Sequence, residues 1–161
     1  KGKCDGLITG DRELVLSIKV ADCTPCYLLD PVKGNFGLIH SGWRGTVGKI
    51  IINGLLNMIS LGSRVKDILV LLGPSISQRN YEVTWEIAKL FKPVNVIQKN
   101  KSHWLVSIRD EIKSDMISFG VLENHVFNTN LCTFETESCH SYRRDGDSAG
   151  RMIAYAGYKW K

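Results

Sequence analysis

The sequence predicts an α/β protein built as a layered sandwich around a mixed β-sheet. Short apolar, β-branched runs alternate along the chain with longer segments whose apolar residues recur at helical spacing. Tight turns separate some of the predicted strands and long crossovers separate others, a mixture typical of a sheet with both antiparallel and parallel neighbours. The length of 161 residues fits one domain, residues 1–161, with a core of its own.

The first part of the chain is rich in predicted strands. Three of them are expected before residue 41, at 13–20, 26–30 and 35–40. A helix follows over residues 47–61, because Ile50, Ile51, Leu55 and Met58 recur near helical spacing. Thr46 is predicted as its N-cap and Gly62 as its end.

The rest of the chain alternates between the two kinds of element. The expected strands are 66–72, 104–106, 123–127 and 151–160, and the expected helices are 84–91 and 107–119. Gly120 ends the second helix. Residues 92–101 are polar and are predicted to form a surface loop.

Composition limits the classes of partner. No apolar run approaches the roughly 20 residues that span a bilayer, and no stripe combines basic and aromatic residues. We therefore expect neither a membrane nor a nucleic acid as a partner. We expect the protein to be a monomer or a homodimer. The net charge of +5 suits a solvated surface or attraction to an anionic ligand such as phosphate.

The five cysteines form no regular disulfide framework, which favours a reducing cytoplasm. Cys26 begins an apolar run and is predicted to lie in the core, although it forms a Cys-x-x-Cys spacing with Cys23. The first residue is Lys1 rather than Met, so we expect an N-terminal portion to precede it.

Cys23 and His40 are the strongest candidates for chemistry. They lie seventeen residues apart, each at the end of a strand-like run and next to turn-forming residues. If the two strand ends meet at one edge of a sheet, the thiol and the imidazole come together. Such a pair either binds a metal such as zinc or acts as a nucleophile and its base. The residues alone leave both roles open.

Three further residues are candidates for binding substrate or phosphate, and the first of them, Arg44, is also a candidate for catalysis together with Cys23 and His40. Arg44 lies between two glycines just before a predicted helix, which favours phosphate. Arg143, followed by Arg144 and Asp145, either binds phosphate or locks a loop by ion pairing. Glu82 follows a loop after a buried strand and is either an acid or base at the site or a surface cap.

Several segments together resemble the YfiH family, also called the laccase-domain or multicopper polyphenol oxidoreductase family. The similarity covers essentially the whole chain, and the segments that carry it are Cys4-Asp5-Gly6-Leu7-Ile8-Thr9, Ala21-Asp22-Cys23-Thr24-Pro25, His40-Ser41-Gly42-Trp43-Arg44-Gly45, Gly73-Pro74-Ser75-Ile76, Cys132-Thr133 and Ser141-Tyr142-Arg143-Arg144-Asp145-Gly146 with Gly150-Arg151-Met152. The resemblance implies a layered α/β fold related to the cysteine–histidine catalytic domain of a bacterial toxin.

The same resemblance implies a zinc site of one cysteine and two histidines. Cys23 matches the cysteine ligand and His40 matches one histidine. The other family histidine belongs to a Gln-x-His motif that precedes the Asp-Gly-Leu-Ile-Thr segment, so we expect the third ligand upstream of Lys1.

The family resemblance implies phosphorolysis of adenosine, inosine, guanosine and methylthioadenosine, and deamination of adenosine. On this hypothesis zinc activates a water, and Arg44 or Arg143 positions phosphate. Copper polyphenol oxidation, the older description, is disfavoured because four scattered histidines cannot supply a multicopper site. Two competing hypotheses are a metal-free cysteine hydrolase, with Cys23 as nucleophile and His40 as base, and a binding module with a degenerate site.

Overall fold

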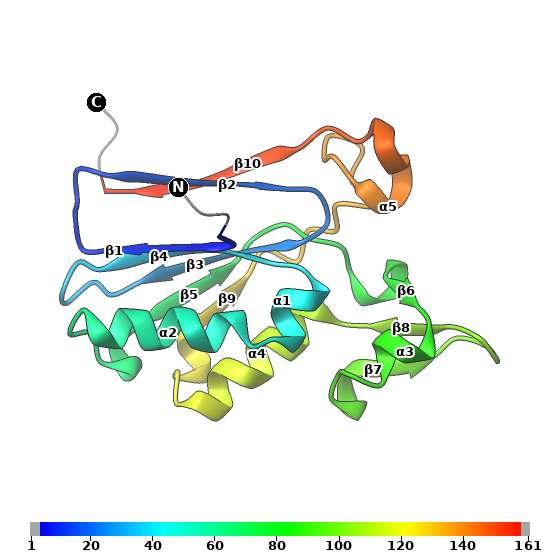
Figure 1. The fold of residues 1–161 in the computed structure, drawn as a ribbon, viewed down its shortest axis with the longest axis horizontal. Coiled ribbons are helices and arrows are strands. Elements are labelled where there is room, and N and C mark those ends of the chain that lie inside the picture. Colours follow the sequence, from blue (N-terminus) through cyan, green and yellow to red (C-terminus); the bar gives the residue numbers. More distant parts are fainter. Residues whose placement is uncertain (1–3, 159–161) are drawn as a thin grey trace.

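The structure is a computed structural model that describes residues 4–158. Its largest sheet has five strands in the order β1-β4-β3-β5-β9, drawn across the middle of Figure 1. β5 and β9 run parallel, and the other neighbours are antiparallel. The predicted mixed sheet is therefore confirmed. The strands are β1 Gly6–Thr9, β4 Phe36–Ser41, β3 Thr24–Leu29, β5 Leu69–Leu72 and β9 Val126–Asn128.

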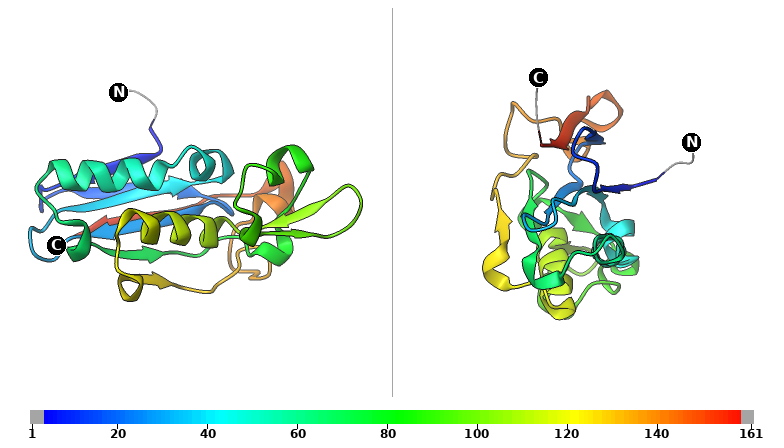
Figure 2. Two further views of the ribbon diagram at one scale, coloured as in Figure 1. Left: turned by 90° about the horizontal axis from the view of Figure 1, so that it is seen from below. Right: turned by 90° about the vertical axis from the view of Figure 1, so that its left-hand side faces the viewer.

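The large sheet is the middle layer of the molecule. On one side lies a two-stranded antiparallel sheet of β2 (Val15–Val20) and β10 (Met152–Gly157). On the other side lie helices α2 (Ile50–Ser60) and α4 (Ile108–Phe119), as Figure 1 and the left view of Figure 2 show. Because both faces of the sheet are covered, most residues of β3 and β4 are buried, instead of alternating between buried and exposed.

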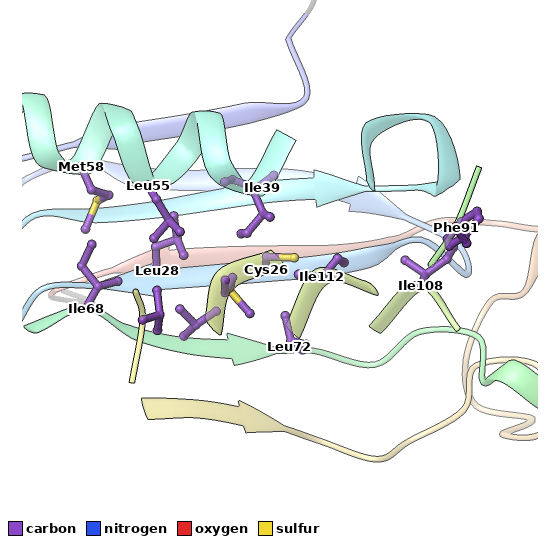
Figure 3. Packing of buried hydrophobic residues seen from close by; sticks show 14 of the residues in the cluster. Cys26, Leu28, Ile39, Leu55, Met58, Ile68, Leu72, Phe91, Ile108 and Ile112 are labelled. Carbon is purple, nitrogen blue, oxygen red and sulfur yellow. The ribbon is translucent and has the colours of Figure 1, made fainter. Parts of the chain in front are cut away.

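The main core lies between the large sheet and the two helices. Leu28 and Ile39 of the sheet pack there with Leu55 and Met58 of α2, and all four are almost completely buried (Figure 3). Gly54 permits the close approach of α2, because a Cβ atom there would lie 2.2 Å from Cδ1 of Ile39. A smaller core between the two sheets contains Leu16, Phe36, Leu38 and Ala154.

A third, small sheet extends beyond the end of the large sheet at which β4 finishes (Figure 1). Its strands are β6 (Glu82–Val83), β8 (Trp104–Val106) and β7 (Val96–Gln98), with helix α3 (Trp85–Ala88) beside them. Two further short helices, α1 (Trp43–Val47) and α5 (Tyr142–Asp145), lie at the same end of the molecule. None of the helices in residues 4–158 is long and apolar enough to cross a membrane.

The prediction of Thr46 as an N-cap is wrong. Thr46 lies inside α1, where its hydroxyl donates to the main-chain oxygen of Gly42 over 2.9 Å. The chain then turns at Gly48 and Lys49, and Lys49 takes a left-handed conformation with φ +58°. The apolar periodicity of α2 gave no sign of this separate turn of helix before it, because α1 is only five residues long.

Several predicted segments are corrected in their bounds or type; residues 66–72, for example, begin within a 3₁₀ turn over Val65–Asp67, and β5 starts only at Leu69. Residues 92–101 are not a loop, because they contain a 3₁₀ turn over Pro93–Asn95 and the short strand β7, of which Ile97 and Gln98 are exposed. Residues 123–127 begin with a 3₁₀ turn over Glu123–His125, and β9 starts only at Val126. The last strand ends at Gly157, and the end of its predicted span lies outside the described residues.

Candidate functional site

The register of β3 and β4 brings Cys23 and His40 together. Pro25 pairs with His40, and Cys23 comes directly before β3, beyond the pair of Thr24 and Ser41. The thiol therefore lies over Gly42, where an added Cβ atom would be 2.8 Å from Sγ of Cys23. Both side chains line one cavity of about 220 Å³, together with Asp5, Gly42, Trp43, Arg44 and Gly45.

Asp5, the residue before β1, contacts both the side chain and the main chain of His40. Its Oδ1 lies 3.1 Å from Nδ1 of His40, and its main-chain oxygen accepts a hydrogen bond from the His40 N–H over 2.7 Å. With Nδ1 engaged, Nε2 is the ring nitrogen left for a ligand. A carboxylate behind the second ring nitrogen is the usual support of a metal-binding histidine.

The surroundings of Cys23 favour the neutral thiol in the chain without a metal. Partial burial, together with the carboxylates of Asp22 and Asp5, raises the pKa of Cys23 to about 11, although Arg151 opposes the shift. Enzymes that use a free thiolate place it where its pKa is lowered instead. The electrostatics of this cavity therefore disfavour Cys23 as a metal-free nucleophile at neutral pH.

Arg44 lies in the wall of the same cavity. It is the second residue of α1, and its guanidinium stacks on the ring of Trp43 with 4.2 Å between the guanidinium carbon and the ring centroid. This stacking fixes the direction of a cation next to Cys23 and His40. The arrangement suits an anionic group entering the cavity.

Arg143 reaches the neighbourhood of the cavity from α5. Its guanidinium stacks on Tyr81 at 5.0 Å and donates to the main-chain oxygen of Glu82 over 2.7 Å. Burial raises the pKa of Tyr81 to about 12, with Cys23 adding to the rise and Arg143 and Arg44 opposing it. Tyr81 thus lies within electrostatic reach of the thiol and both arginines.

Glu82 and Arg144 are placed differently from Arg143. The carboxylate of Glu82 pairs with Lys99 and His103 of the β7–β8 hairpin, and the cavity lining does not include it. Arg144 donates to four main-chain oxygens and pairs with Asp145. Arg144 therefore locks the loop before α5, one of the two roles expected for this arginine pair.

Cys23 and His40 supply two donors for a metal ion. Within residues 4–158, no cluster of three or more His, Cys, Asp and Glu side chains is placed to hold one. Cys26 is completely buried in the main core, as predicted. The ring of His140 packs against Gly150.

Sequence reasoning selected neither Asp5, which lines the cavity, nor Tyr81, whose ring lies under the guanidinium of Arg143. Asp5 precedes β1, a four-residue strand in which apolar and polar residues do not alternate clearly. The sequence therefore did not predict that β1 pairs with β4. Tyr81 follows the loop after β5, at the turn before the small sheet. The sequence signal for both is position alone, because Asp5 lies within a segment that carries the family resemblance and Tyr81 directly precedes the candidate Glu82.

The fold and the site together define a class of α/β protein, in which a cysteine–histidine pair lies at one end of a mixed sheet. The chain belongs to the family described as multi-copper polyphenol oxidoreductase laccase, whose model matches residues 1–159. The resemblance to the YfiH family is thereby confirmed.

Curated relatives carry names that refer to purine nucleosides. The chain is 31% identical to "Purine nucleoside phosphorylase" of Deinococcus radiodurans, over 95% of this chain and 60% of that protein. It is 34% identical to the protein of the same name from Borreliella burgdorferi, over 94% of this chain and 68% of that protein. It is 31% identical to "Adenosine deaminase RL5" from an unknown prokaryotic organism, over 92% of this chain and 60% of that protein.

Solved structures share the fold. YlmD from Geobacillus stearothermophilus matches with a TM-score of 0.91 and 28% identity, over 97% of this chain and 61% of that one. YfiH from Bacillus licheniformis matches with a TM-score of 0.92 and 27% identity, over 96% and 61%. The chain thus spans about 60% of the length of most of these relatives.

Proposed function

We propose that this chain carries the reaction centre of a zinc-dependent purine nucleoside enzyme. Its reactions would be phosphorolysis of adenosine, inosine, guanosine and methylthioadenosine, and deamination of adenosine. The observation that carries the proposal is the placement of Cys23 and His40 on one cavity, with Asp5 behind the imidazole. The names of the relatives, purine nucleoside phosphorylase and adenosine deaminase, support the substrate class.

The donor set suits zinc. A thiolate and an imidazole nitrogen are ligands that zinc prefers, and Asp5 would keep the His40 ring oriented. Cys23 and His40 would hold the ion together with a histidine outside residues 4–158. When bound, zinc supplies Lewis-acid activation of water and of polar substrate groups.

Arg44 and Arg143 would bind the anionic co-substrate. Arg44 lines the cavity beside Cys23 and His40, so its guanidinium can hold phosphate against the sugar carbon at which the glycosidic bond breaks. Arg143 would contribute a second cation, fixed by Tyr81 and by the main-chain oxygen of Glu82. Glu82 would thus act in the site through its main chain.

The test measures both reactions on the full-length protein with adenosine as substrate. Phosphorolysis gives adenine only when phosphate is present, whereas deamination gives inosine without phosphate. Cys23→Ala is expected to lose both products, and Cys139→Ala, a cysteine outside the cavity lining, is expected to keep them. Equal product formation by Cys23→Ala and the unaltered protein would overturn the proposal.

Metal analysis separates the zinc enzyme from its competitors. One zinc per chain that protects Cys23 from alkylation supports the zinc enzyme and rules out a metal-free cysteine hydrolase. Copper in its place, with oxidation of a phenol, would support the oxidase that the family description names. Full-length protein without metal and without activity on either substrate would indicate a binding module.

A further inference from the structure

Asp22, the residue before Cys23, has an unusual backbone conformation. Its φ is +77°, in the left-handed region that residues other than glycine, asparagine and aspartate seldom occupy. Its side chain is nevertheless buried, with 7% of the residue exposed. A carboxylate in a buried, left-handed turn requires contacts that compensate for both features.

Asp22 has such contacts, to three segments that are distant in the sequence. Its Oδ1 accepts a hydrogen bond from the hydroxyl of Thr133 over 2.6 Å, and its Oδ2 accepts one from the main-chain N–H of Arg143 over 2.7 Å. Its main-chain oxygen accepts from the N–H of Ile76 over 3.0 Å. One residue thereby joins the β2–β3 turn to the loop after β5, the segment after β9 and the start of α5.

These contacts affect the positions of both Cys23 and Arg143. The left-handed turn at Asp22 directs the chain so that Cys23 lies over Gly42 in the cavity. The bond to the Arg143 N–H fixes the first turn of α5, from which the guanidinium reaches Tyr81 and the oxygen of Glu82. Movement of Asp22 would therefore displace the thiol and the arginine together.

We propose that Asp22 is a positioning residue that holds Cys23 and Arg143 in a fixed relation to each other. It lies outside the cavity lining, and it acts on Cys23 through the backbone turn and on Arg143 through a hydrogen bond to the main-chain N–H, while the bond from Thr133 anchors its carboxylate. The inference rests on the proposed function, because that function assigns Cys23 to the metal and Arg143 to phosphate.

Substitutions of Asp22 and Thr133 distinguish the contribution of the left-handed backbone turn from that of the side-chain hydrogen bonds. Asp22→Gly keeps the left-handed turn without strain but removes both side-chain hydrogen bonds. Asp22→Asn tolerates the same turn and can keep both, since its oxygen accepts from Arg143 N–H while its amide donates to the Thr133 hydroxyl. Thr133→Val removes one bond at a completely buried site and preserves the side-chain shape.

The readouts are zinc affinity, measured by competition with a chelator, and the separate kcat and KM values for phosphate. Asp22→Gly is expected to bind zinc about tenfold more weakly and to raise the phosphate KM about tenfold, the range found for supporting residues of metal sites. Asp22→Asn is expected to restore both values to within about threefold, and Thr133→Val to lie between. Circular dichroism and the midpoint of thermal unfolding establish that each variant is folded.

Two outcomes would overturn the inference. One is a folded Asp22→Gly protein with unchanged zinc affinity and unchanged phosphate KM. The other is an Asn variant as defective as the Gly variant, which would assign the effect to the charge of Asp22 instead of its hydrogen bonds. If the unaltered protein binds zinc but does not act on nucleosides, the proposed function fails, and the zinc measurements still decide the role of Asp22.

Discussion

Two cavities at the same end of the described part of the molecule differ in how they are built. The cavity of Cys23 and His40, about 220 Å³, is lined by three separate parts of the chain: Asp5, Cys23, and His40 with residues 42–45. The second, about 360 Å³, is lined by Trp85, Ala88, Lys89, Phe91, Pro93, Val96, Gln98 and Trp104, all from one stretch of twenty residues. The rings of Trp85 and Trp104 lie 5.2 Å apart beside it.

The difference shows that volume and chemistry are separate properties of a cavity. The larger one is mainly apolar and is built by local packing of α3 against the small sheet. The smaller one gathers a thiol, an imidazole, a carboxylate and a guanidinium, which only long-range strand pairing can bring together. Converging polar groups are the better indicator of a reaction centre.

The largest effect is expected for His40. His40→Ala removes one of the two proposed metal ligands that lie within residues 4–158, so zinc content should fall to a small fraction per chain and nucleoside turnover by at least about a hundredfold, more than the loss of a supporting residue costs. Zinc analysis and product formation from adenosine check this. His125→Ala, outside both cavity linings, serves as the matched control. Full zinc content in His40→Ala would contradict the assignment.

The second prediction compares Arg143 with its neighbour. Arg143→Ala should raise the phosphate KM by about tenfold or more, since a charge-assisted hydrogen bond contributes about 1.5–3 kcal/mol. Arg144→Ala should instead lower the free energy of unfolding, because its guanidinium donates to four main-chain oxygens of the loop before α5. Phosphate kinetics and urea unfolding separate the two effects. An equal rise of the phosphate KM in Arg143→Ala and Arg144→Ala would contradict the different roles assigned to the two arginines.

Asp5 should have a smaller influence on the same cavity. Asp5→Asn retains the shape of the side chain but weakens the charge-assisted bond to Nδ1 of His40. Because the Asp5 side chain is 68% exposed and screened by water, zinc affinity should fall by about tenfold, the lower end of the range for such partners. Chelator competition measures it, with Asp11→Asn as the exposed control. An unaltered affinity would mean that the His40 ring needs no support from Asp5.

The smallest effect on activity is expected at the aromatic cavity. Trp85→Ala should change nucleoside kcat and KM by less than about twofold, because this cavity shares no lining residue with the other. Loss of the contact with Trp104 should lower the free energy of unfolding by about 1 kcal/mol. Steady-state kinetics and urea unfolding provide both values. A large rise in nucleoside KM in Trp85→Ala would indicate that the aromatic cavity also takes part in nucleoside binding.

Much of the fold followed from local pattern. The apolar spacing of Leu55 and Met58 predicted α2, and Ile108, Ile112 and Met116 predicted α4, since each helix buries one face against the sheet. Short elements were missed or misplaced, such as α1, β1 and β7. Elements of three to five residues have too few positions to show a period, and tertiary contacts stabilise them.

The sequence by itself determined the residue types of the site and the expectation that two of them meet. Cys23 and His40 stand at the ends of apolar runs, and antiparallel pairing of neighbouring runs is enough to bring such ends together. Tertiary structure alone decided that Asp5 supports His40, that Arg143 faces Tyr81 while Arg144 locks a loop, and that Asp22 joins three distant segments. The physical reason is that these contacts depend on hydrogen-bond geometry between segments as much as 121 residues apart, which no local pattern encodes.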